Sequence, residues 1–147
     1  MAVLQSSTRA CVKQALAMSS AQGKDFIRSM GIAAAEFTIG VEATEAITVN
    51  IQLKNDLGEE LSAVTAVHVY VFADALGVSF NAQDYTTIAA GTDGDLVEVV
   101  ADKLLACTCE ADGDLDIVLT ETGAGTVYLG VKLSNGEFAI SGAITHA

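Results

Sequence analysis

The chain has 147 residues, a net charge of -12 at pH 7, and neither proline nor tryptophan. Hydrophobic residues make up 51% and charged residues 18%, which excludes an intrinsically disordered chain, and the length suits one ordinary domain with an appendage. Only 5% of the residues are aromatic, so few rings are available to stack on bases or sugars.

Charge divides the chain into two parts. Residues 1–35 carry four cations against one acid, whereas residues 36–147 carry 18 acids against three lysines, so the net charges are +3 and -15. We therefore predict a basic N-terminal arm at 1–35 and an acidic domain at 36–147, with surfaces that meet different partners.

The arm has the composition of a short helix. Hydroxyl residues at 6–8 can cap a helix through "RACVKQALAMSSAQ", and Gly23 is expected to end it before a second turn through "KDFIRSM". Its apolar stripe must pack on something, either the protein's own body or another subunit. The predicted partner-docking residues are Arg9, Val12, Lys13, Leu16, Lys24, Phe26, Ile27 and Arg28.

From residue 36 onward the apolar residues recur with a period of two, which is typical of half-buried strands. Strands are predicted at 37–41, 47–54, 65–74, 96–100, 104–110, 115–121, 126–133 and 137–144, with weaker signals at 78–89. Glycine and aspartate turns separate them at intervals of about 8 to 12 residues, which predicts a mainly β protein, an antiparallel sandwich or barrel.

The strand at 65–74 is apolar on both faces. Its valines at 67, 69 and 71 lie on one face, and His68, Tyr70 and Phe72 lie on the other. Because one face of such a sheet normally meets water, we expect the second face to be covered by a crossing loop, the arm or a neighbouring subunit. His68, Tyr70 and Phe72 are thus a candidate subunit interface.

The histidines and cysteines do not indicate catalysis. Three cysteines (Cys11, Cys107 and Cys109) with two histidines provide neither a disulfide framework nor a zinc pattern. Cys107 and Cys109 share one strand face and are expected in the core, and His68 is interpreted as a packed strand histidine. Without nucleotide-binding loops either, we predict a protein that is not an enzyme and has no cofactor.

The stretch "EADGDLD" contains the candidate metal ligands Asp112, Asp114 and Asp116, since carboxylates at alternate positions can converge on a hard cation. The Asp-Gly pair at 112–113 is also a strong turn signal. We favour the second interpretation, in which residues 111–114 form the bend of a hairpin and Asp116 faces solvent. No metal is therefore predicted.

Nucleic acid and membranes are disfavoured as partners. The acidic domain repels phosphate, while the few cations of the arm suit an acidic protein surface. No apolar run approaches the ~20 residues that span a bilayer, and the N-terminus has no apolar segment typical of a secretory signal. We expect synthesis and assembly inside a cell.

Residues 36–147 resemble virion proteins of tailed bacteriophages that have an immunoglobulin-like β-sandwich. The resemblance rests on the order of the blocks "IQLKN", "GTDG", "CEADGD", "TETGAGTVYL" and "LSNGEFAISGAI". It implies a structural role as a head decoration, or cement, protein. Such a protein would be made in the host cytoplasm, bind the major capsid protein on the outer capsid surface, and bridge capsomers as a homo-oligomer, with a trimer favoured.

Two other roles remain open from the sequence. One is a module associated with the tail or a fibre, and the other is a surface sandwich that binds carbohydrate or the host. Loop tips would make the contacts in a sugar-binding protein, and only Phe80 and Tyr85 offer rings near the loops. An enzyme is the least favoured class.

Overall fold

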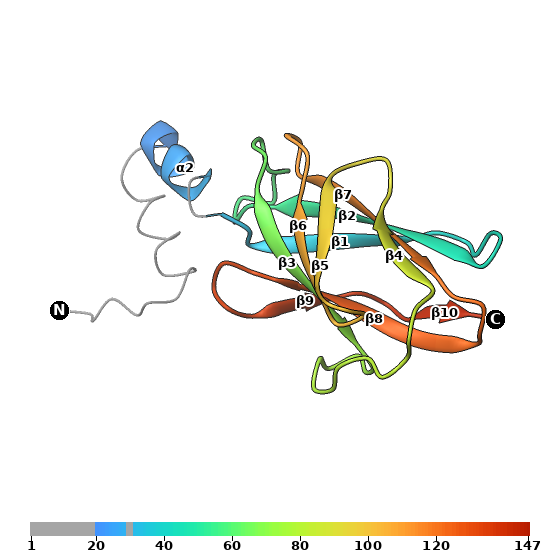
Figure 1. The fold of residues 1–147 in the computed structure, drawn as a ribbon. Coiled ribbons are helices and arrows are strands. Elements are labelled where there is room, and N and C mark those ends of the chain that lie inside the picture. Colours follow the sequence, from blue (N-terminus) through green and yellow to red (C-terminus); the bar gives the residue numbers. More distant parts are fainter. Residues whose placement is uncertain (1–19, 29–30) are drawn as a thin grey trace.

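A computed structural model gives the structure of the chain and describes residues 20–28 and 31–147. The described part contains one helix, α2 (Ser20–Arg28), and ten strands (Figure 1). The strands are β1 (Ala34–Ile39), β2 (Ala46–Lys54), β3 (Ala66–Phe72), β4 (Thr87–Ala90), β5 (Asp95–Val100), β6 (Leu104–Thr108), β7 (Asp114–Thr120), β8 (Gly125–Lys132), β9 (Phe138–Ile140) and β10 (Ile144–His146).

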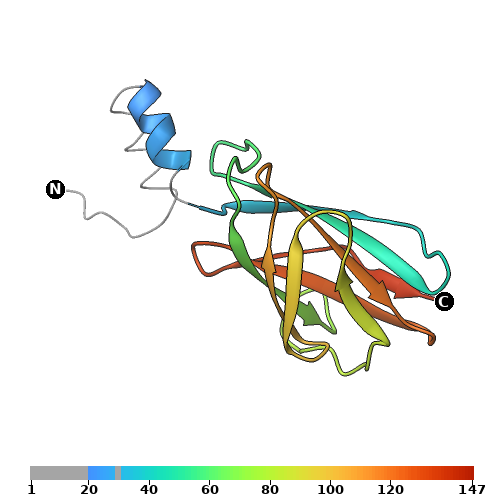
Figure 2. The same ribbon diagram turned by 45° about the horizontal axis from the view of Figure 1, so that its top comes forward.

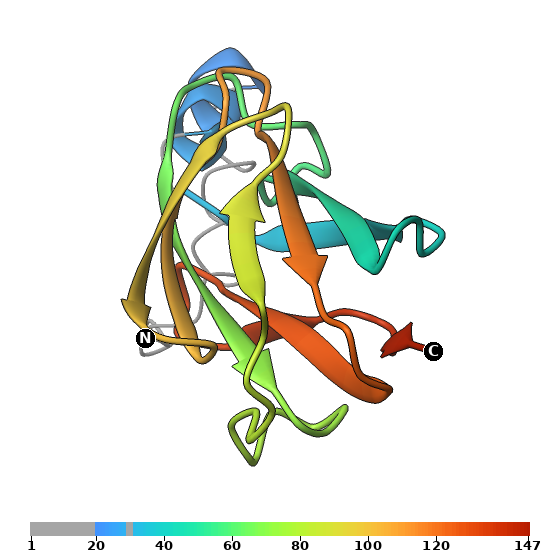
Figure 3. The same ribbon diagram turned by 45° about the vertical axis from the view of Figure 1, so that its right-hand side comes forward.

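The strands form two antiparallel sheets that pack face to face. The four-stranded sheet has the order β1-β2-β7-β4, and the second sheet has the order β10-β8-β3-β6-β5, with β9 also paired to β8. Figure 3 shows the two layers, and strands of both contribute the buried core residues. The fold is therefore mainly β, as predicted from the alternation of apolar residues.

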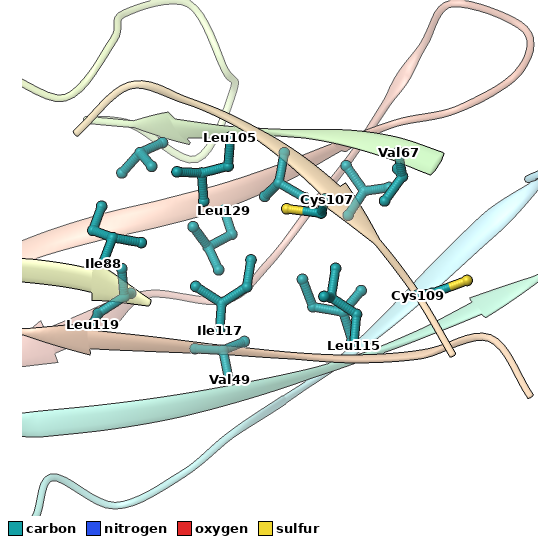
Figure 4. Close-up of a cluster of buried hydrophobic side chains, with 14 of the residues drawn as sticks. Val49, Val67, Ile88, Leu105, Cys107, Cys109, Leu115, Ile117, Leu119 and Leu129 are labelled. Atoms are coloured by element: carbon teal, nitrogen blue, oxygen red, sulfur yellow. The ribbon is translucent and has the colours of Figure 1, made fainter. Parts of the chain in front are cut away.

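The core comes from alternate residues of the central strands. Val49 and Ile117 from one sheet face Leu105 and Leu129 from the other, and all four side chains are fully buried (Figure 4). Burial of one such side chain contributes about 1.5–3 kcal/mol, so the facing rows stabilise the pairing of the two layers. A shift of one residue in any of these strands would turn its apolar row to solvent.

The predicted hairpin at "EADGDLD" is wrong. Residues 110–114 do form a tight turn, in which the Glu110 N–H donates to the Asp114 carbonyl at 2.8 Å. Gly113 has a φ of +83° there, and a Cβ atom would approach the Leu53 carbonyl oxygen to 2.9 Å. However, β6 and β7 belong to different sheets, so this turn carries the chain across the sandwich.

Other boundaries also differ from the sequence-based expectation, since β1 begins at Ala34, inside the segment at 1–35 that was predicted to be the arm. Gly23 lies inside α2 and does not end a helix. The single strand expected at 137–144 is divided into β9 and β10 because Ser141 interrupts it: its hydroxyl accepts from the Leu129 N–H and donates to the Gly142 carbonyl.

Among the described residues, no helix has the length and apolar character needed to span a bilayer.

Candidate docking surface

Strand β3 exposes a different kind of residue on each face. Its three valines are buried in the core, whereas His68, Tyr70 and Phe72 point outward, as the alternation predicted. His68 is exposed, Tyr70 is half-buried and Phe72 is buried. We call the side of the six-stranded sheet that points away from the core the outer face.

Phe72 is covered by parts of its own chain. Its ring lies 5.8 Å from that of Phe80, which follows the loop after β3, and 5.4 Å from that of Phe138 in β9. Tyr70 joins the group, with its ring 5.0 Å from Phe138. Gly130 in β8 leaves the space that the Phe72 ring occupies, since a Cβ atom at position 130 would collide with that ring. We call Tyr70, Phe72, Phe80 and Phe138 the aromatic cluster.

The outer face carries apolar side chains from the aromatic cluster to the edge of the sheet, together with the exposed His68 and with Lys132, whose Nζ lies 5.3 Å from the centre of the Phe138 ring. His68 pairs with Ala106 in β6, which in turn pairs with Val97 in the edge strand β5. Val97 is 69% exposed, and the neighbouring valines at 99 and 100 are exposed as well. Phe80 is still 53% exposed, so the crossing loop covers only one end of the face.

The predicted docking residues of the arm lie mostly outside the described part of the chain. Arg9, Val12, Lys13 and Leu16 precede it, and the side chains of Ile27 and Arg28 are not described. Lys24 is exposed on α2. Phe26 on the same helix is 49% exposed. Figures 1 and 2 show α2 standing beyond the end of the sandwich where β1 begins, clear of both sheets.

Three carboxylates gather where β7 meets the loop after β4. One oxygen each from Asp93, Asp114 and Asp116 lies within 4.8 Å of the others. Two of the predicted metal candidates are thus brought together, while Asp112 is exposed and does not belong to the group. Asp93 takes its place, because the turn at 91–95 folds over β7.

The expected solvent exposure of Asp116 is wrong. Asp116 is only 8% exposed because the loop at 91–93 covers it, with the Asp116 N–H donating to the Asp93 carbonyl at 2.8 Å. Its carboxylate accepts hydrogen bonds from the Thr92 N–H and from the Asn50 amide, which also bonds Asp114. The Asn50 amide therefore supplies the donor that holds these two carboxylates together.

The two neighbouring aspartates, Asp114 and Asp116, change the titration of Asp93. Loss of solvation raises the pKa of the Asp93 carboxyl above its usual range, and the negative charges of Asp116 and Asp114 raise it further. Asp93, Asp114 and Asp116 thus concentrate negative charge at one place, and hydrogen bonds from Asn50 and Thr92 hold Asp116 there. They do not by themselves identify a cation site.

Sequence reasoning missed a group of buried polar side chains near the C-terminus. His146 is 1% exposed, its ring meets that of Tyr85 at 5.6 Å, and its Nδ1 lies 3.7 Å from a Glu42 oxygen. Neither nitrogen of His146 has a hydrogen-bond partner in the described part of the chain, nor does the Tyr85 hydroxyl. Burial and the charge of nearby Glu121 raise the pKa of Tyr85, so its hydroxyl stays protonated at neutral pH.

The cysteines in the domain are structural. Cys107 and Cys109 are buried and free, as expected, and burial raises the pKa of the Cys107 thiol to about 12. A thiol with so high a pKa supplies almost no thiolate at neutral pH.

An open hollow lies beside Cys109, lined also by Gly94, Asp95 and Thr108.

Comparisons with known proteins give no identity for the chain: no protein-family model, curated protein or solved structure matches it.

Proposed function

We propose that the chain is a decoration protein of a tailed-bacteriophage head, with a sandwich of immunoglobulin-like topology and a helical N-terminal arm. In this proposal the arm docks on the outer surface of the assembled capsid, and several copies bridge neighbouring capsomers. The acidic domain then faces solvent. The sequence resemblance of residues 36–147 supports the class of protein, and the placement of α2 supports the mode of docking.

The observation that carries the proposal is the separation of α2 from the acidic sandwich. The helix stands off one end of the domain and exposes Lys24. Among the residues whose side chains the structure describes, the buried apolar core lies between Ile32 and Ile144 and includes none from α2. A segment that is not needed for the core, and is opposite in charge to the body, is suited to bind a partner.

Bridging explains how weak contacts could stabilise a particle. A copy held at two or more points on the lattice gains affinity from the high effective concentration of each further contact. Each bridged contact adds buried area between capsomers that internal pressure pulls apart. Charge complementarity between the arm and an acidic capsid surface would set the orientation and speed of docking more than its affinity.

The test is binding to particles that lack the protein. Full-length chains that carry Lys24→Glu with Phe26→Glu should bind such particles at least tenfold more weakly than the unaltered chain, measured by co-sedimentation. Lys103→Glu is the matched control, because it makes the same charge reversal at an exposed position on the β5–β6 turn. Equal binding by the α2 variant and the control would overturn docking through the arm.

A further inference from the structure

The outer face brings several exposed apolar side chains together on an acidic domain, among them Phe80, Val97 and Val100. It extends from the aromatic cluster over His68 and Ala106 to the exposed valines of β5. An exposed apolar area of this kind on a soluble protein usually marks a contact with another molecule. The crossing loop accounts for the cover over Phe72 but leaves the rest of the face open.

We propose that residues 1–19 of one copy lie across the outer face of a second copy, so that exchanged arms join the chains into an oligomer. This goes beyond docking on the capsid, because it assigns a partner to the outer face, and it predicts an assembly that forms without any particle. In this arrangement α2 remains available to the lattice while the preceding segment holds a neighbour.

The chemistry of the segment matches that of the face. Residues 1–19 contain two cations and no acid, while the domain that carries the face has a net charge of -15. Val12 and Leu16 are four residues apart, so they would share one side of a helix that also holds Cys11 nearby. Such a helix would place apolar side chains on the sheet and cations toward the surrounding acids, including Asp95 and Glu137, which are both exposed.

The length of the segment also fits. A helix of 19 residues is about 28 Å long at 1.5 Å per residue. The five strands in the order β10-β8-β3-β6-β5, spaced about 4.8 Å apart, span about 20 Å. The segment can therefore cross the whole outer face, from the aromatic cluster to Val97 at the edge.

The placement of α2 favours a second copy over the segment's own domain. The Ile32 N–H donates to the Ser134 hydroxyl, so the arm leaves the body at the turn between β8 and β9. From there α2 extends away from the sandwich (Figures 1 and 2). We take this direction of α2 as the reason to assign the preceding segment to a neighbouring copy and not to its own domain.

Cysteine cross-linking of the full-length chain tests the proposal directly. Cys11 lies in the segment, and Cys107 and Cys109 are buried. The variant Val97→Cys adds a thiol to the outer face. Mild oxidation should then give disulfide-linked species of two or more chains on a non-reducing gel, at least fivefold more than for Val41→Cys. Val41 is the matched control because it is 91% exposed in the turn between β1 and β2.

The outcomes separate the alternative arrangements. The double variant Cys11→Ser/Val97→Cys should lose the link, and if it does not, the face meets another face and the arm exchange is wrong. A link confined within single chains would mean that the segment covers its own domain, which also overturns the proposal. Absence of any link beyond the Val41→Cys level does the same. Because no particle is present, failure here leaves the capsid proposal to its own test.

Discussion

Asp116 illustrates how a single residue can differ from its sequence-based interpretation. Alternation placed it on the outward side of β7, and that is where it lies, opposite Asn50. It is nevertheless buried, because Gly91 allows the loop after β4 to pass directly over it: a Cβ atom at Gly91 would come within 2.6 Å of the Asp116 Cβ atom. The pattern of one strand cannot indicate which loop will cross it.

The three neighbouring aspartates, Asp93, Asp114 and Asp116, allow a prediction about a single residue. The pKa of Asp93 is raised by loss of solvation and then by Asp116 and Asp114, so Asp116→Asn should lower it, as measured by NMR titration of the Asp93 carboxyl. Asp84→Asn, a change to an exposed aspartate that is not among the causes of the shift, is the control. An unchanged Asp93 titration in the Asp116 variant would contradict the assigned cause.

The sign of the effect on stability follows from the direction of the shift. A carboxyl whose pKa is raised by folding binds its proton more tightly in the folded chain, so its charged form opposes folding. That penalty is fully present above the raised pKa of Asp93 and disappears as the pH falls below it. Protonation of Asp93 as the pH falls should therefore add less to the free energy of unfolding in the Asp116→Asn variant than in the unaltered chain.

At the scale of elements, the existence of the strands was predictable and their partners were not. Strict alternation from Ile47 to Leu53 placed β2 almost to the residue, because one face of the strand packs against the core. The turn signal at Asp112-Gly113 was also correct. A tight turn fixes the bend but not the pairing beyond it, and here β7 pairs with β2 and β4, while β6 pairs with β3 and β5.

The same limit applies to the candidate surface. The outward residues of β3 follow from a period of two, so His68, Tyr70 and Phe72 could be assigned to one face from the sequence. The aromatic cluster could not, because Phe80 and Phe138 reach it through a loop and through β9. The buried position of His146 depends equally on the pairing of β10 with β8, which its three residues do not predict.

The buried His146 of strand β10 allows a prediction about the stability of the fold. His146 is buried with two nitrogens that lack hydrogen-bond partners in the described part of the chain, which costs free energy that an apolar ring of similar shape would not. His146→Phe should therefore raise the free energy of unfolding by about 1 kcal/mol in urea titrations at pH 8. A Phe ring can keep the edge contact with Tyr85.

The other histidine provides the control. His68 is exposed on β3, so His68→Phe should change the free energy of unfolding by less than about 0.5 kcal/mol. A destabilised His146→Phe chain would mean that the imidazole nitrogens are satisfied, by Glu42 or by bound water, and that the histidine anchors the C-terminal strand.

At the scale of the whole molecule, charge and apolar surface are separated in a way that suits assembly. The sequence joins a basic arm to an acidic domain, and that domain exposes apolar residues on its outer face. In the proposed assembly, the arm and the outer face account for association with copies and with a lattice, and the acidic remainder would keep assembled particles apart through like charge. The core of the described residues lies between Ile32 and Ile144, so the proposed exchange of arms would leave it in place.

As a decoration protein, the chain should be present on a capsid in many copies. Quantitative mass spectrometry of purified particles, with the major capsid protein as the internal reference, measures this directly. A decoration protein should be present at a copy number close to that of the major capsid protein. A few copies per particle would contradict it and would place the chain in a tail or fibre instead.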